Sequence, residues 1–157
     1  QNDPVCRVSI IAPCYNAAAY LDGICDLLER QPYYRWELIA VDDASTDETA
    51  SVLERHAVAD ERAKPVFLET NGGAAAARNI GLERAHGEHV WFLDPDDDFE
   101  PSLLAEALDA LETTGADVAI FGCREESYDA AGTLRSTRDV LPPVSGVHSG
   151  DELHRAI

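Results

Sequence analysis

In the stretch "HVWFLDPDDDFEP" (His89–Pro101), an apolar run passes directly into a cluster of acids. The run Val90–Leu93 is typical of a buried strand. Four aspartates follow within five positions: Asp94, Asp96, Asp97 and Asp98. Two like charges about 5 Å apart cost roughly 3 kcal/mol at an effective dielectric constant of about 20. A solvated turn does not need four aspartates, so this cluster calls for an explanation in terms of function.

Outward from this stretch, strand-like runs alternate with helical patterns along the chain. We expect strands over five ranges: Val5–Pro13, Trp36–Asp43, Pro65–Thr70, His89–Leu93 and Ala116–Cys123. We expect helices over four ranges: Tyr20–Gln31, Ser45–Ala57, Asn71–Gly87 and Pro101–Gly115. Ser45 and Glu48 match the capping-box pattern that begins a helix. The alternation predicts an α/β fold with a mainly parallel central sheet flanked by helices.

The last part of the chain, from Arg124 on, carries weaker patterns. Its polar runs are compatible with a hairpin, and Ser149–Ile157 reads as the first turns of a helix. We therefore expect the chain to be part of a longer protein.

The composition limits the partners. The chain has 157 residues, is 45% hydrophobic and carries a formal net charge of -18. This length and apolar content are enough for one compact domain with a core. The negative field repels nucleic-acid backbones and anionic membranes, so we expect no nucleic-acid partner. A phosphorylated ligand would need an accompanying cation.

Membrane and redox signals are sparse. The sequence has no run of 18 apolar residues and no basic-then-apolar leader, so we expect neither a membrane span nor secretion. The four cysteines form no CxxC pair and no zinc-like spacing: Cys6, Cys14, Cys25 and Cys123. We interpret them as reduced, mostly buried thiols of a cytoplasmic protein.

Three expected strand ends carry polar groups, in "APCYN", "VDDAST" and "LDPDDDF". In an open parallel sheet these ends share one edge, and ligands bind there where the strand order reverses. Asp94 and Asp96 form a D-x-D turn, whose carboxylate oxygens suit Mg²⁺ or Mn²⁺. A bound cation would turn the mutual repulsion into coordination and allow an acidic protein to hold a diphosphate.

Other residues near this edge have two interpretations each. Asp42–Asp43 can shield a helix N-terminus, or one of the two can accept hydrogen bonds from a base edge or a ribose. Gly72–Gly73 precedes a helix but lacks the spacing and lysine of a P-loop. The run Ala74–Ala77 suits close packing. Arg78 can pair with a phosphate or hold a carboxylate in place.

Together, three segments resemble the family 2 glycosyltransferases of the Rossmann-like GT-A fold. They are "VSIIAPCYNAAAYL" (Val8–Leu21), "WELIAVDDASTDET" (Trp36–Thr49) and "NGGAAAARNIGLERAHGEHVWFLDPDDDFEP" (Asn71–Pro101). The resemblance runs from Val5 to Ile120, and its specificity lies in the order and spacing of the motifs. It implies a nucleotide-sugar donor, most readily a UDP-sugar, and transfer of the sugar with inversion to a glycan, lipid or protein acceptor.

The resemblance also implies roles for single residues. Pro13 and Tyr15 match positions that contact the nucleoside, and Asp43, with Asp42 beside it, matches the carboxylate that binds the base. Arg78 matches a basic position near the nucleotide. Two acids match the D-x-D: Asp94, near the ribose and the metal, and Asp96, which coordinates Mn²⁺ or Mg²⁺.

The resemblance leaves the catalytic base unassigned. In this family the base comes from a carboxylate well after the D-x-D, and neither Glu125–Glu126 nor Asp151–Glu152 fits that place. We expect residues 1–122 to form the donor-binding core and 123–157 to begin an acceptor-side region that is cut short. We also expect a cytoplasmic location, with peripheral attachment to the inner face of the membrane left open.

Two alternatives remain at this stage. A non-catalytic nucleotide-sugar binding module would keep the fold without an acceptor half. A nucleotidyltransferase would need a glycine-rich and basic loop after the first strand, and "APCYNAAAYL" has neither feature.

Overall fold

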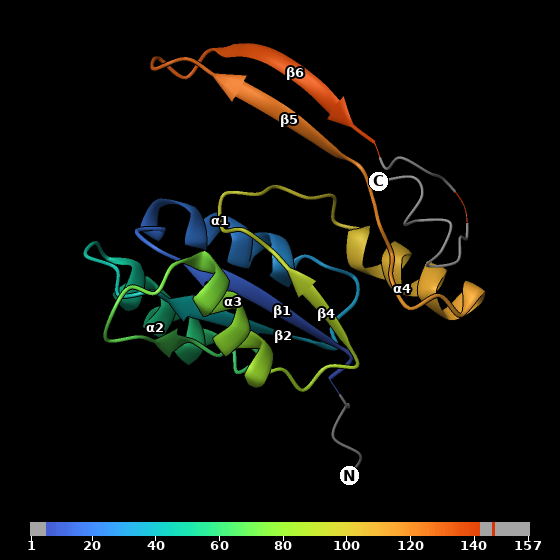
Figure 1. The fold of residues 1–157 in the computed structure, drawn as a ribbon, viewed down its shortest axis with the longest axis horizontal. Coiled ribbons are helices and arrows are strands. Elements are labelled where there is room, and N and C mark those ends of the chain that lie inside the picture. Colours follow the sequence, from blue (N-terminus) through green and yellow to red (C-terminus); the bar gives the residue numbers. More distant parts are fainter. Residues whose placement is uncertain (1–5, 142–145, 147–157) are drawn as a thin grey trace. The chain divides into compact units, whose positions relative to one another are not determined.

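The computed structural model of the chain describes residues 6–141 and residue 146, and its ribbon is drawn in Figure 1. The chain divides into two compact units, Gln1–Ala105 (the N-terminal unit) and Glu106–Ile157 (the C-terminal unit). Helices and strands alternate through the first unit: β1 (Val8–Cys14), α1 (Ala18–Glu29), β2 (Trp36–Asp42), α2 (Thr49–Ala59), β3 (Val66–Phe67), α3 (Ala74–Glu83) and β4 (His89–Phe92). Three further elements follow: α4 (Leu103–Thr114), β5 (Cys123–Tyr128) and β6 (Leu134–Val140).

The N-terminal unit is built on a parallel sheet with the strand order β3-β2-β1-β4. Val8 of β1 pairs with Trp36 of β2 on one side and with His89 of β4 on the other. The chain thus moves outward from β1 to β3 and then returns past β1 to β4. The strand order therefore reverses beside β1, where open α/β sheets bind their ligands. The parallel α/β sheet predicted from the sequence is confirmed.

Helices cover both faces of this sheet. The face of α1 that is buried consists of Leu21, Ile24, Cys25 and Leu28, at helical spacing. On α3, Ala77 is buried against Ile39 and Val41. The connection through α1 runs outward from β1 to β2, and the connection through α3 runs back from β3 to β4. Because such connections are right-handed, the two helices lie on opposite faces of the sheet. Figure 1 shows α3 lying across β1 and β2.

The amino-terminal edge of the sheet is closed by a buried carboxylate. Glu37 of β2 is 2% exposed and accepts hydrogen bonds from Ser9 Oγ (2.6 Å), Lys64 Nζ (2.6 Å) and the His86 N–H (2.8 Å). Burial acts to raise the pKa of Glu37, but these hydrogen bonds outweigh it and lower the pKa to about 2. This cluster ties β1, β2 and the turn before β4 together, far from the edge where the sequence places the ligand.

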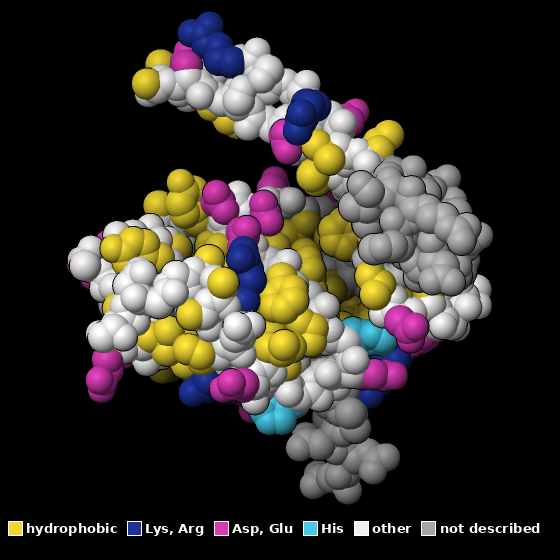
Figure 2. Space-filling view, viewed as in Figure 1, with side chains coloured by type: hydrophobic (Ala, Val, Ile, Leu, Met, Phe, Trp, Pro, Cys, Tyr) yellow, Lys and Arg dark blue, Asp and Glu magenta, His cyan; other side chains and the backbone are white. Residues whose placement is uncertain are grey.

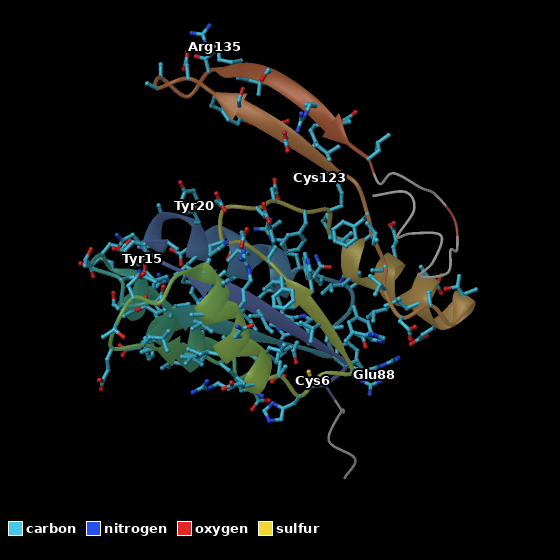
Figure 3. The ribbon with its side chains drawn as sticks, viewed as in Figure 1. Cys6, Tyr15, Tyr20, Glu88, Cys123 and Arg135 are labelled. Atoms are coloured by element: carbon cyan, nitrogen blue, oxygen red, sulfur yellow. The ribbon has the colours of Figure 1, made fainter. Side chains whose placement is uncertain are left out.

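A surface ion pair lies at the same edge. Arg7 Nη2 is 3.0 Å from Glu88 Oε2. Figure 3 shows Glu88 at the opposite end of the N-terminal unit from Tyr15, which follows β1. The amino-terminal edge is therefore held by charged contacts, and the carboxyl-terminal edge remains for a site.

Three predictions of secondary structure need correction. Ala116–Cys123 is not a strand, since only Cys123 begins β5, and the apolar Val118, Ile120 and Phe121 are exposed. A strand needs a hydrogen-bonded partner, and no described residue pairs with residues 116–122. Ser45 and Glu48 do not form a capping box, because α2 begins at Thr49 with no side-chain cap. The third strand is only Val66–Phe67, which pairs with the end of β2.

The C-terminal unit contains the hairpin that the polar pattern allowed. β5 and β6 pair antiparallel, with Glu125 opposite Arg138 and their charged groups 2.9 Å apart. The helix expected over Ser149–Ile157 lies outside the described residues. The functional boundary expected between residues 122 and 123 does not coincide with the structural division after Ala105, and it stays a prediction.

The four cysteines are free thiols, of which Cys14 and Cys25 are buried and Cys123 is exposed. Burial is the main cause that raises the pKa of Cys14 to about 12, and the negative charge of the nearby Asp42 adds to it. Among the residues that the structure describes, no helix is both long and apolar enough to cross a membrane.

Candidate functional site

The carboxyl ends of β1, β2 and β4 meet at one edge of the N-terminal unit. The Asp43 N–H donates to the Cys14 carbonyl (2.8 Å), and the Leu93 N–H donates to the Ile11 carbonyl (3.0 Å). These bonds continue the strand pairing up to the residues that follow each strand. The polar groups after the three strands therefore lie at the same edge, as the sequence predicted.

The loops after β1 and β2 are joined by side-chain hydrogen bonds. Ser45 Oγ accepts from the Asn16 N–H (2.9 Å), and Asn16 Oδ1 accepts from the Thr46 N–H (2.8 Å). Asn16 has a φ of 51° and Ala44 a φ of 58°, conformations that non-glycine residues seldom adopt. Such strain persists only where the surroundings fix it, so the two loops form one rigid rim.

The N-terminus of α1 is capped by the second loop. Thr49 Oγ1, which is buried, accepts from the Ala17 N–H (2.8 Å), and Asp47 Oδ2 accepts from the Ala18 N–H (3.2 Å). The Thr49 hydroxyl donates to Asp47 Oδ1 (2.5 Å), and this bond is the main cause that lowers the pKa of Asp47. These contacts fix the position of Tyr15, whose side chain remains 54% exposed at the rim.

Asp43 connects the end of β2 to the start of α3. Its side chain is 2% exposed, with Oδ1 accepting from the Gly72 N–H (2.8 Å) and Oδ2 from the Gly73 N–H (2.7 Å). Gly73 is the N-cap of α3 and has a φ of 84°, a region that favours glycine. Asp43 thus caps a helix, but the helix is α3 and not α2. Each carboxylate oxygen has a second lone pair that can still accept a hydrogen bond.

Arg78 of α3 reaches the acid that follows β4. Its Nη2 donates to Asp94 Oδ1 at 2.6 Å, with 35% of the Arg78 side chain and 48% of the Asp94 side chain exposed. Of the two roles that the sequence allowed for Arg78, the structure shows that it holds a carboxylate. A guanidinium has five N–H donors, so further donors remain for an anion at this place. In Figure 2, acidic side chains cluster beside a basic one on the visible face.

The other aspartates of this loop have fewer partners. Asp98 Oδ1 accepts from the Phe99 N–H, and the Asp97 carboxylate accepts a hydrogen bond from the backbone of Asp94. The Asp96 carboxylate makes no hydrogen bond or ion pair with any described residue. The pKa of Asp97 is raised by partial burial and by the charges of Asp94 and Asp96. A cation would relieve this repulsion.

The donors present fit a divalent cation that is shared with a ligand. Within residues 6–141 and 146, no three Asp, Glu, His or Cys side chains converge into a complete metal site. Mg²⁺ and similar cations often take one or two carboxylates from the protein and the remaining oxygens from substrate phosphates and water. Asp96, with Asp94 beside it, offers that partial set of ligands.

The sequence as a whole identifies the family. The family model described as "Glycosyl transferase family 2" matches residues 9–150. The chain belongs to glycosyl transferase family 2. TuaG from Bacillus subtilis (strain 168), a glycosyltransferase assigned by its name to teichuronic acid biosynthesis, is 45% identical over 102 residues, which are 65% of this chain and 40% of TuaG. The poly(ribitol-phosphate) beta-N-acetylglucosaminyltransferase TarS from Staphylococcus aureus (strain Mu50) is 34% identical over 117 residues, which are 73% of this chain and 20% of TarS.

Solved structures of the family share the fold. The structure of residues 1–349 of S. aureus TarS in complex with UDP-GlcNAc has a TM-score of 0.65 and 33% identity, covering 71% of this chain and 32% of that one. The mannosyltransferase PcManGT from Pyrobaculum calidifontis, in complex with GDP-Man and Mn²⁺, has a TM-score of 0.62 and 31% identity, covering 76% and 36%. The Rossmann-like GT-A fold expected from the sequence is confirmed. This family 2 chain spans less than half of each of these proteins.

The structure brings most of the expected site residues to one edge. Pro13 is half-buried at the end of β1, Tyr15 projects from the rim, and Asp42 is buried with Oδ1 accepting the Ser45 N–H (3.1 Å). Arg78 and Asp94 are in contact. The sequence analysis missed the residues that join the loops, Asn16 and Thr49, since their partners lie about 30 positions away in the sequence.

The acids that the sequence left unassigned as a catalytic base stay unassigned. Glu125 is paired with Arg138, and Glu126 Oε2 accepts from the Tyr128 hydroxyl, both within the exposed hairpin of the C-terminal unit. Asp151 and Glu152 lie outside the described residues.

Proposed function

We propose that the N-terminal unit binds the donor of a glycosyltransferase that transfers a sugar from a nucleotide diphosphate sugar, most readily a UDP-sugar, with inversion. The observation that carries the proposal is the Asp94–Asp98 loop, where Arg78 holds Asp94 while Asp96 has no partner among the described residues. Solved relatives in complex with UDP and UDP-GlcNAc, and one in complex with GDP-Man and Mn²⁺, support this assignment.

Each end of the donor has residues suited to it. Tyr15, with Pro13 at the end of β1, offers an exposed aromatic surface to the nucleoside. Asp43 and its neighbour Asp42 offer acceptor oxygens to the base edge, and the clamp on Gly72–Gly73 holds the Asp43 carboxylate in one orientation. The rigid rim keeps these groups in place, so little ordering is needed on binding.

The diphosphate end would lie over the acidic loop. Asp96 would hold Mn²⁺ or Mg²⁺, with Asp94 positioned beside it by Arg78. When bound, such a cation stabilises the negative charge that develops on the departing diphosphate. The spare donors of Arg78 would contact the same charge from the other side.

The chemistry of transfer requires one more group. The acceptor oxygen forms a bond to the anomeric carbon, and the bond from that carbon to the diphosphate oxygen breaks with its electron pair leaving on the diphosphate. The acceptor proton must pass to a general base on the opposite face of the sugar. We assign that base to no described residue. We propose that the acceptor is a glycan or lipid of a cell-surface polymer, at the cytoplasmic face of the membrane.

Calorimetry with UDP tests the donor assignment. UDP should bind the 157-residue chain in the presence of Mn²⁺, and removing Mn²⁺ or introducing Asp96→Asn should weaken binding by on the order of tenfold or more. Asp109→Asn, on an exposed position of α4, makes the same chemical change outside the loop and should leave binding unchanged.

Two results would refute the assignment. If neither the removal of Mn²⁺ nor Asp96→Asn weakens UDP binding, the metal plays no part in holding the donor. Absence of UDP binding to folded chain at millimolar concentration would remove the UDP donor itself. Metal-dependent binding by a parent protein that shows no transfer to any acceptor would favour a binding module over an enzyme.

A further inference from the structure

A groove lies within the N-terminal unit between α1 and the loop that follows β4. The groove is open to solvent and has a volume of about 400 Å³. One wall is α1, including Tyr20, Gly23, Leu27 and Arg30, and the other is the loop Pro95–Asp98. No role proposed above uses α1, so the groove is a feature apart from the donor site, although both share the acidic loop.

The wall on α1 is a single stripe. Positions 20, 23, 27 and 30 are three or four residues apart and therefore lie on one face of the helix. The Tyr20 side chain is 53% exposed, and a Cβ placed on Gly23 would meet no atom within 4 Å. Glycine within a helix costs about 1 kcal/mol relative to alanine, and steric crowding does not require it here. The missing side chain instead leaves the floor of the groove open.

The lining combines apolar surface with hydrogen-bonding groups. Ile24 and Leu27 form the apolar part, and the Tyr20 ring stands at the edge. Arg30 Nη2 lies 3.8 Å from Asp26 Oδ2, so the guanidinium forms an ion pair with an acid of the groove itself. A few polar groups around an apolar floor are typical of small-molecule sites. A sugar ring, with an apolar face and peripheral hydroxyls, matches this surface.

The charge of the groove selects among sugars. The carboxylates of Asp26 and of Asp96–Asp98 outnumber the single guanidinium of Arg30. Without a bound cation, an anionic ligand such as a sugar phosphate or a uronic acid would be repelled. Hydroxyl groups of a neutral sugar can donate hydrogen bonds to the same carboxylates.

The position of the groove indicates what this sugar does. Asp96 lines the groove and is also the residue that we propose to hold the cation on the donor diphosphate. A hydroxyl held in the groove would therefore approach the donor across the same loop. We propose that the groove binds the acceptor, and that the acceptor presents a neutral, hydroxyl-rich sugar. This inference rests on the proposed donor function and names the second substrate of the same reaction.

Backbone amide shifts of the isotope-labelled 157-residue chain test the groove. The probes are chitobiose, maltose and lactose as neutral sugars, and glucose 1-phosphate and glucuronic acid as anionic ones. The neutral probes should shift the amide signals of α1 and of Asp96–Asp98, with dissociation constants in the millimolar range. The anionic probes should not shift these signals.

Three variants locate the binding. A Cβ at position 23 meets no atom within 4 Å, so Gly23→Leu should extend into the groove, and Tyr20→Ala removes the exposed ring. Each change should weaken saccharide binding by on the order of tenfold. Ala59→Leu also enlarges a small side chain to leucine, at an exposed position of α2, and should leave saccharide binding unchanged. UDP binding in the presence of Mn²⁺, measured on the same samples, should survive all three changes.

The outcomes separate the two proposals. Saccharide shifts that are absent, or that persist in Gly23→Leu, overturn the groove as the acceptor site while UDP binding still supports the donor site. Tighter binding of the anionic probes overturns the neutral class. Groove shifts that grow with protein concentration without sugar show a second copy of the chain there and overturn the proposal. Loss of UDP binding in the unmodified chain refutes the donor function instead.

Discussion

Asp43 belongs both to the proposed donor site and to the contacts that stabilise the fold. Its buried carboxylate accepts the Gly72 N–H at 2.8 Å and the Gly73 N–H at 2.7 Å, one on each oxygen. Asp43→Asn keeps the shape of the side chain but replaces one acceptor oxygen by an NH₂ group. That group would face an N–H donor, so one charge-assisted hydrogen bond is lost and a buried donor is left without an acceptor.

The magnitude follows from these two effects. A hydrogen bond to a charged group contributes about 1.5 to 3 kcal/mol, and the unsatisfied NH₂ group of the buried side chain adds to the loss. We expect Asp43→Asn to lower the free energy of unfolding by about 2 to 4 kcal/mol. This is a large part of the 5 to 15 kcal/mol, roughly, that stabilises a typical domain.

Urea unfolding followed by tryptophan fluorescence measures the change. The chain has two tryptophans, Trp36 in β2 and Trp91 in β4, and both lie in the N-terminal unit. Their signal therefore reports the unit that contains Asp43. Asp98→Asn is the matched control, since Asp98 is exposed and, among the described residues, accepts only the adjacent Phe99 N–H. The control should stay within about 0.5 kcal/mol of the original chain.

A small effect would refute this reasoning. If Asp43→Asn lowers the free energy of unfolding by no more than Asp98→Asn does, the clamp on Gly72–Gly73 does not hold the loop. The start of α3 would then be fixed by other contacts, and Asp43 would be available wholly to a ligand.

Three further perturbations test other parts of the structure. Because the pKa of Glu37 is lowered to about 2, its ionised form stabilises the fold above pH 4.5, and this contribution is lost as the pH falls towards 2. Glu37→Gln should remove roughly 3 kcal/mol at neutral pH and flatten that acid limb in urea titrations, whereas an unchanged limb would contradict the assignment. Gly87→Ala places a Cβ 2.5 Å from the Ser9 backbone nitrogen, so thermal unfolding should show a loss of about 1 to 3 kcal/mol, and no loss would contradict that approach. Arg78→Met breaks a partly exposed ion pair with Asp94 and should change stability by less than about 1 kcal/mol. The same variant should weaken UDP binding with Mn²⁺ by on the order of tenfold, and equal UDP affinity would exclude Arg78 from the site.

The layered fold was predictable because its signals are local. The buried positions of α1, such as Leu21 and Leu28, stand at helical spacing in the sequence, and Leu38–Val41 of β2 is a continuous apolar run that ends at Asp42. In a parallel sheet covered by helices, the strands are buried on both faces, so their sequences are nearly continuous apolar runs. The order of these patterns then implies which strand ends share an edge.

The failures arose where a long-range contact decides the structure. Val118, Ile120 and Phe121 have strand-like chemistry, but a strand also needs a neighbour to pair with, and none of the described residues provides it. Ser45 has the chemistry of a helix cap, but its hydroxyl accepts from Asn16 on another loop. Local patterns do not show which of several acceptors a donor will choose.

The candidate site was predictable in its place and only partly in its contacts. The Asp94–Asp98 cluster could be located at a strand end from sequence, because an apolar run precedes it directly. The sequence allowed Arg78 to bind either a phosphate or a carboxylate, and the structure pairs it with the Asp94 carboxylate. The groove on α1 could not be foreseen, since Gly23 becomes a floor only when the loop after β4 lies opposite.

Paramagnetic broadening by Mn²⁺ tests most directly the claim that one edge of the sheet binds a cation and a nucleotide diphosphate together. The chain carries a formal charge of -18, so weak binding of Mn²⁺ over its surface is the alternative to exclude. In amide spectra recorded with UDP, substoichiometric Mn²⁺ should broaden residues 94–98 and Tyr15 first, and Asp96→Asn should abolish this effect. Broadening that is spread over the acidic helices, or that is the same with and without UDP, would contradict the account.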